Sequence, residues 1–167
     1  IYEKEENNDL MIGILSRVVE FRNHESGDHI RSVRTITELL LRKLVRKTDI
    51  YPLSEENINL IKTASALHDV GKITTPEEIL NKPGKLTAEE FAIMKDHAAA
   101  GARILEDMPY GQDKPLFRYA MEICRWHHER WDGKGYPDGL WGEQIPIAAQ
   151  VVALADVYDA LTNERCY

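Results

Sequence analysis

Helical periodicity runs through nearly every long segment of this 167-residue chain. Apolar residues recur at intervals of three and four, first at Leu10, Ile14, Val18 and Phe21, and then at Ile30, Val33, Thr37, Leu40, Leu41 and Leu44. This spacing places apolar side chains on one face of a helix. No segment of useful length alternates between apolar and polar residues as a half-buried strand does. The sequence therefore predicts an all-α fold, built as a single helical bundle.

The third predicted helix begins after Ser54, whose hydroxyl can cap it, and runs through Ile58 and Leu67. We expect it to end near Gly71, where a left-handed residue is easily accommodated. His68 and Asp69 would then lie in its last turn.

The segment Thr87-Ala88-Glu89-Glu90 has the form of a capping box and predicts a fourth helix through His97 and Leu105. A fifth helix is predicted from Lys114 to Glu129. Residues 130–145 are rich in glycine and contain Pro137, so they predict a long loop. Pro146 is well placed to open a last helix.

The length and the 43% hydrophobic content fit one domain with one core, so we expect residues 1–167 to form a single domain with residues 1–20 as a leading helix. The net charge is −7, and no Lys/Arg-rich stretch stands apart from the helical pattern. A polymeric nucleic acid is therefore disfavoured as a partner. A small phosphorylated ligand stays open, because bound metal ions would supply positive charge locally.

Cys124 and Cys166 are far apart and form no CxxC pair, which favours a reducing, cytoplasmic location. No apolar run approaches the ~20 residues that span a bilayer, so no membrane segment is expected. The chain begins at Ile1 and stops at Tyr167 just after a helical pattern, so we expect a piece of a longer protein.

Five of the six histidines belong to a set of imidazoles and carboxylates that predicts a metal cluster, and with it hydrolytic chemistry. The predicted ligands are Glu25, His29, His68, Asp69, His97, His127, His128 and Asp156. His24 fits no ligand position, and we assign it to the surface.

Spacing supports several members of this set. Glu25 and His29 lie four residues apart, on one helical face, although an ordinary surface ion pair would have the same spacing. Adjacent His68 and Asp69 would point about 100° apart on a helix, so that His68 binds one ion while Asp69 bridges to a second. Lys72 follows close behind and could neutralise a phosphate oxygen.

His127 and His128 repeat this adjacency at a predicted helix end, where two imidazoles could serve neighbouring ions. The alternative is that both histidines lie at a solvated helix C-terminus, where the negative end of the helix dipole favours histidine. Asp156 lies in an apolar run, where a carboxylate is costly unless it is paired or metal-bound. Asp159 could orient a histidine or simply occupy a polar position at the bundle edge.

Four motifs give the chain a resemblance to the HD-GYP phosphodiesterases, a bacterial branch of the HD metal-phosphohydrolase superfamily, over roughly residues 21–167. They are His68-Asp69-Val70-Gly71-Lys72, Ile79-Leu80-Asn81-Lys82-Pro83-Gly84-Lys85-Leu86, His127-His128-Glu129-Arg130 and Asp132-Gly133-Lys134-Gly135-Tyr136-Pro137. Their order and spacing make the resemblance highly specific.

The resemblance implies an all-helical domain that hydrolyses cyclic di-GMP to pGpG and often onward to GMP. It implies metal ligation by His68, Asp69, His97, His127, His128 and Asp156, and Glu25 and His29 match the residues that add a third ion in some members. Lys72 matches a lysine that contacts phosphate, and Arg165 falls where an arginine near the ligand phosphate is expected.

For the reaction we expect a hydroxide that bridges two metal ions to attack phosphorus in line with the departing 3′ oxygen, with Asp69 and Lys72 as catalytic residues. Two or three divalent ions are expected, most simply iron or manganese, while zinc, nickel and magnesium stay open.

Gly133, Gly135, Tyr136 and Pro137 match the GYP element, which would bind substrate near the site or be exposed for partner contact. Domains that synthesise cyclic di-GMP are candidate partners, and the resemblance suggests a fused sensory or receiver domain. It also indicates that the chain stops before further C-terminal helices of the family.

Two other functions stay open from the sequence. One is a weakly active or inactive cyclic di-GMP receptor that signals by contacting partner proteins. The other is a phosphodiesterase for a different cyclic dinucleotide, such as cyclic GMP-AMP. All eight predicted ligands are present, which favours the enzyme over the receptor.

Overall fold

The structure, a computed structural model, describes residues 2–23, 28–109, 111 and 113–162. Its helices, in chain order, are α1 (Tyr2–Arg22), α2 (Asp28–Val45), α3 (Glu55–Ser65), the 3₁₀ helix η1 (Val70–Thr74), α4 (Glu77–Leu80), α5 (Ala88–Glu106), α6 (Pro115–Trp126), the 3₁₀ helix η2 (Gly142–Gln144) and α7 (Ile147–Thr162). The described residues contain no β-strand, only one bridge between Asp132 and Trp141. The predicted all-α fold is confirmed.

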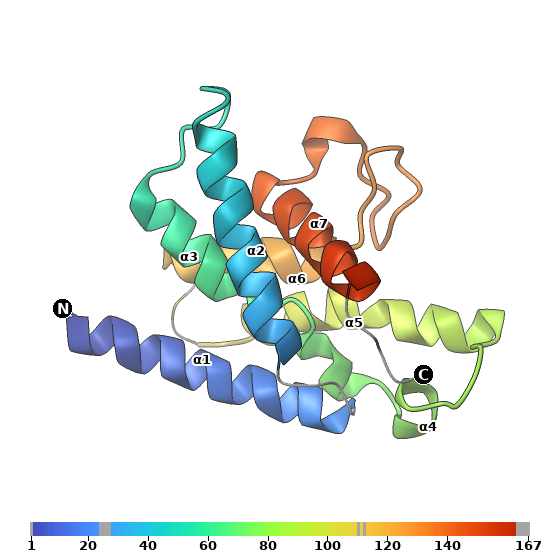
Figure 1. Cartoon of the computed structure of the whole chain (residues 1–167). Coiled ribbons are helices and arrows are strands. Elements are labelled where there is room, and N and C mark those ends of the chain that lie inside the picture. The colour runs from blue at the N-terminus through green and yellow to red at the C-terminus, as the bar shows by residue number, and fades with distance from the viewer. Residues whose placement is uncertain (1, 24–27, 110, 112, 163–167) are drawn as a thin grey trace.

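The buried core residues come mainly from α2, α3, α5, α6 and α7, and Figure 1 shows how these helices are arranged. Helix α2 packs against α3 and α7, while α6 packs against α3, α5 and α7. Fully buried side chains from four of these helices meet at the centre: Val33 and Leu41 of α2, Ile58 and Ile61 of α3, Ile123 of α6, and Val152 of α7. The helical period predicted for α2 therefore describes its buried face correctly.

Helix α1 lies along the lower edge of Figure 1 and contacts η1. The sequence correctly predicts a helix here, but the four apolar residues that define its predicted period do not face the core. Leu10, Ile14, Val18 and Phe21 are 48% to 85% exposed, whereas Ser16, Val19 and Glu20 are buried. Polar contacts fix this orientation, because Asp9 accepts hydrogen bonds from Arg34 of α2 and from Thr63 of α3.

Helix α3 begins as predicted, with a capping box between Ser54 and Asn57. It ends at Ser65, however, so the prediction that His68 and Asp69 lie in its last turn is wrong. Both residues lie in the turn that joins α3 to η1.

Gly71 is required for a different reason from the one predicted, because it does not adopt a left-handed conformation. A Cβ atom on Gly71 would lie 1.9 Å from the carbonyl oxygen of His97 and 2.5 Å from the amide nitrogen of Gly101. The segment carrying Asp69 therefore touches the backbone of α5, and this close approach brings Asp69 and His97 together.

The remaining boundaries follow the sequence closely. Thr87 and Glu90 form the predicted capping box at the start of α5. Helix α6 ends at Trp126, three residues earlier than expected, with His127 as its C-cap. The predicted loop is irregular apart from η2, and α7 begins directly after Pro146. Within the described ranges, no helix is long and apolar enough to cross a membrane.

Two glycines provide a paired test of this packing. Gly71→Ala should lower the free energy of unfolding by at least about 1–3 kcal/mol, because its new methyl group meets immobile backbone. Gly13→Ala should raise it by about 0.5–1 kcal/mol, since Gly13 lies inside α1 and a Cβ there meets nothing within 4 Å. Urea denaturation of both variants checks these signs, and a neutral Gly71→Ala would contradict the close approach.

Candidate metal centre

Three histidines of the predicted ligand set are held by main-chain carbonyl groups. Nδ1 of His68 lies 2.9 Å from the Ser65 oxygen, and Nδ1 of His97 lies 2.6 Å from the Met94 oxygen. Nδ1 of His127 contacts the carbonyls of Ile123 and Cys124 at 2.9 and 3.1 Å. A carbonyl oxygen only accepts, so each Nδ1 is the donor, and in the neutral ring Nε2 carries a lone pair.

The first group of donor atoms consists of Asp69, His97, His127 and His128, whose ligand atoms lie within 4.8 Å of one another. Oδ1 of Asp69 is 3.3 Å from Nε2 of His97 and 3.8 Å from Nε2 of His127. Nε2 of His128 is 3.1 Å from Nε2 of His97. These residues come from the α3–η1 turn, α5 and the end of α6.

The second group consists of His29, His68 and Asp156, again within 4.8 Å. Nε2 of His29 is 3.4 Å from Nε2 of His68 and 3.6 Å from Oδ1 of Asp156. Nδ1 of His29 donates to Oδ2 of Asp159 at 2.7 Å. Of the two roles considered for Asp159, the structure therefore has the one that orients a histidine.

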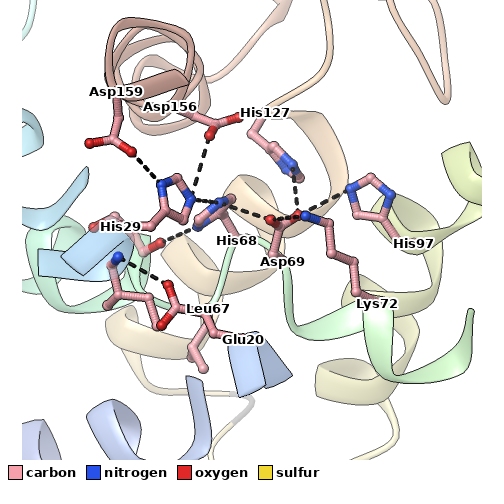
Figure 2. A network of polar contacts seen from close by, with 12 residues as sticks. Glu20, His29, Leu67, His68, Asp69, Lys72, His97, His127, Asp156 and Asp159 are labelled. Carbon is pink, nitrogen blue, oxygen red and sulfur yellow. Dashed lines mark hydrogen bonds and ion pairs between the residues drawn. The ribbon is translucent and has the colours of Figure 1, made fainter. Parts of the chain in front are cut away.

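Asp69 connects the two groups. Its Oδ2 lies 3.3 Å from Nε2 of His68, on the side opposite to the contacts that Oδ1 makes with His97 and His127. Figure 2 shows these side chains pointing toward one another from separate segments of the chain. Residues more than a hundred positions apart thus form one continuous cluster.

Burial and neighbouring charges set the protonation of the cluster. Burial lowers the pKa of His127 to well below its usual value and that of His128 to about 3, and the surrounding imidazoles add to the effect. For His68, burial also lowers the pKa, but the Asp69 carboxylate outweighs it and raises the pKa to about 9. Burial raises the pKa of Asp69, yet Lys72 and His68 together bring it well below 3.8.

The cluster fits divalent cations on two observations. Nε2 of His127 is buried and has no hydrogen-bond partner among the described residues. In addition, Nε2 of His29 lies 3.4 Å from Nε2 of His68, and both Nδ1 atoms act as donors to other groups, so both Nε2 atoms are directed at the space where a cation would lie. Imidazole together with carboxylate is a donor set for first-row divalent metals.

Lys72 lies at the edge of the cluster, with its Nζ 2.6 Å from Oδ2 of Asp69. The backbone of η1 that carries Lys72 is held by Arg22 of α1. The Arg22 guanidinium donates to the carbonyls of Lys72, Ile73 and Thr75 at 3.0, 2.7 and 2.8 Å. Helix α1 therefore contributes to the site through a backbone clamp.

The GYP element reaches the cluster through Tyr136, whose ring stacks on that of His128 with centroids 4.7 Å apart. Gly135 packs against the backbone after α6, where a Cβ would lie 2.4 Å from the Arg130 nitrogen. Gly133 has a φ of +71°, as expected of a glycine in this loop. Pro137 is exposed beside Tyr136.

Glu129 fixes the far side of this loop. Its buried carboxylate accepts hydrogen bonds from the backbone N–H groups of Asp138, Gly139 and Leu140 at 2.7 to 3.0 Å.

Sequence reasoning assigned no role to Glu129 or to Arg22. Glu129 was visible only as part of the His-His-Glu-Arg motif, while nothing in the sequence pattern marked Arg22. Glu25 and Arg165 lie outside the described residues, as do His24 and Cys166. Their predicted roles stay predictions.

Comparison with known families identifies the family to which the chain belongs. Residues 13–167 match the family model described as HD domain, and the chain belongs to the HD domain family. Membership of this family implies binding of divalent metal ions. The family resemblance predicted from the sequence is confirmed.

Curated relatives with similar sequences are named as phosphodiesterases of cyclic dinucleotides. A 3′3′-cGAMP-specific phosphodiesterase 2 of Vibrio cholerae is 44% identical over 92% of this chain and 27% of its own length. A cyclic di-GMP phosphodiesterase of Thermotoga maritima is 40% identical over 94% of this chain and 40% of its own length. The response regulator RpfG of Xanthomonas campestris is named a cyclic di-GMP phosphodiesterase. It is 39% identical over 99% of this chain and 41% of its own length. The chain thus spans well under half of each of these relatives.

Glu129→Ala should leave three backbone N–H groups without their acceptor and release the loop that carries Tyr136. We expect a loss of about 1–3 kcal/mol in the free energy of unfolding and faster amide exchange at residues 138–140. Hydrogen exchange followed by mass spectrometry measures the loop directly. Glu143→Ala, an exposed change in the same loop, is the control and should leave exchange at these amides unaltered.

Proposed function

We propose that this chain is a metal-dependent phosphodiesterase domain that hydrolyses cyclic di-GMP to pGpG, GMP or both. One observation carries the proposal. Asp69 contacts histidines of two neighbouring donor groups, and Lys72 places a positive charge 2.6 Å from the same carboxylate. Two cation sites sharing one carboxylate, with an ammonium group alongside, suit the hydrolysis of a phosphodiester.

His68, Asp69, His97, His127, His128 and Asp156 would hold two ions, and His29 with Glu25 would support a third. Bound divalent ions supply charge neutralisation at phosphate and lower the pKa of water. We expect these ions to be iron or manganese, since histidine and carboxylate ligands suit both metals.

The protein's own groups have separate tasks. Lys72 neutralises a phosphate oxygen, and its position depends on the contact with Asp69 and on the Arg22 clamp. Tyr136, stacked on His128, places an aromatic ring beside the cluster, where it would contact substrate. Gly133, Gly135, Pro137 and Arg165 complete the proposed substrate-binding set, and Gly135 does so by allowing the loop to approach α6.

A second substrate is favoured by the comparisons. The 44% identical relative from Vibrio cholerae is named as specific for 3′3′-cGAMP, whereas others near 40% are named for cyclic di-GMP. The same phosphodiester chemistry serves both ligands, so both belong in the assay. Contact of the loop with cyclic di-GMP synthesising domains, and fusion to a sensory or receiver domain, complete the proposal.

The direct test is turnover of each cyclic dinucleotide by protein purified without oxygen and supplied with iron or manganese. Chromatography should show pGpG or GMP from cyclic di-GMP, or the linear products of 3′3′-cGAMP. Asp69→Ala should reduce kcat by at least about a hundredfold, with the helical circular dichroism retained. Unchanged turnover in Asp69→Ala would refute the assignment, and tight binding without any product in the unaltered protein would favour the receptor.

Lys72→Met tests the ammonium separately from the metal ligands. We expect kcat to fall by about 10² while the metal content per chain is unchanged, because Lys72 acts on phosphate. Lys85→Met removes an exposed lysine outside the site and should match the unaltered protein in both measurements. Equal kcat values for the two variants would remove Lys72 from the mechanism.

A further inference from the structure

A pocket formed by α1, α2 and α3 carries four cationic side chains outside the candidate metal centre. It has a volume of about 300 Å³, and its lining includes Arg17 of α1, Arg31 and Arg34 of α2, and Lys62 of α3. We call it the basic pocket. A hollow surrounded by cations contrasts with the net charge of −7 of the whole chain.

Two of the four cations already have acidic partners. Arg34 pairs with Asp9, and Nζ of Lys62 lies 2.5 Å from Oε2 of Glu38. Arg17 and Arg31 are exposed, and neither forms an ion pair with a carboxylate in the part of the chain that the structure describes. The pocket therefore keeps an excess of positive charge and two guanidinium groups with donors to offer.

Gly13 forms part of the wall of the basic pocket, in the interior of α1. Glycine within a helix is destabilising by about 0.5–1 kcal/mol relative to alanine. Packing does not require it here, since a Cβ on Gly13 would meet nothing within 4 Å. The missing side chain leaves the pocket open between helices, which is the room that a bound ligand needs.

We propose that the basic pocket binds a small phosphate-bearing anion. Guanidinium groups match phosphate oxygens with paired hydrogen bonds, and the described residues of the lining include no aromatic side chain that would select a base. Ile30 lines this pocket and also the small cavity beside His29 and His68, so a bound anion contacts the same α1–α2 region as the candidate metal centre. Soluble phosphates and phospholipid headgroups share this chemistry.

The test is calorimetric titration of the full chain with pyrophosphate. The double change Arg17→Ala with Arg31→Ala should weaken binding by at least about tenfold, and added salt should weaken binding to the unaltered protein. Gly13→Leu tests the same pocket by filling it, without removing a charge. The matched control is Arg118→Ala, which removes an exposed arginine of α6 and should bind as the unaltered protein does.

Two further experiments test where the anion binds and whether it comes from a soluble phosphate or a lipid headgroup. Asp69→Ala should retain pyrophosphate binding, because the basic pocket is separate from the proposed phosphodiesterase centre; this arm stands even if that activity fails. Binding to phosphatidylcholine vesicles only when they contain phosphatidylglycerol, lost in the Arg17 and Arg31 variant, assigns the phosphate to a lipid headgroup. No binding of either probe, or equal binding by all pocket variants, overturns the proposal.

Discussion

The position of the Asp69 carboxylate is the constraint on which the rest of the site depends. Its two oxygens face histidines of two different groups, and Lys72 contacts the same carboxylate. This position requires the turn after α3 to touch the backbone of α5, which only a glycine at position 71 permits. The buried small residues of α5, from Ala98 to Ala102, allow that approach. In this fold, the placement of the charged residues of the site therefore depends on the packing of small residues.

Much of the fold could be predicted from the sequence, because helical period and capping chemistry are local properties. The Ser54 and Thr87 caps and the start of α7 after Pro146 are examples. The buried face of α1 could not be predicted in this way. The four apolar residues of its predicted period are exposed, and its inward face is selected by long-range polar contacts such as that between Asp9 and Arg34. Helical periodicity shows that the two faces of a helix differ in polarity, but it does not show which face packs against the core.

The candidate site also has features that the sequence predicts and features that it does not. Residue type and adjacency were enough to select His68, Asp69, His127 and His128, since such groups are costly to bury without partners. The carbonyl groups that orient the imidazoles belong to the backbone and leave no trace in residue identity. Glu129 and Arg22 also act on backbone, one on the GYP loop and the other on η1. The candidate ligands are thus readable from the sequence, whereas the groups that orient them are seen only in the folded chain.

We propose that the two donor groups hold separate cations on either side of Asp69. The most direct measurement is a crystal structure of the protein loaded with manganese or iron, with anomalous scattering recorded at the absorption edge of that metal. We expect one peak among Asp69, His97, His127 and His128, and another at His68, Asp69 and Asp156, beside His29. Fully loaded crystals without anomalous density at either position, or with density only elsewhere on the molecule, would contradict it.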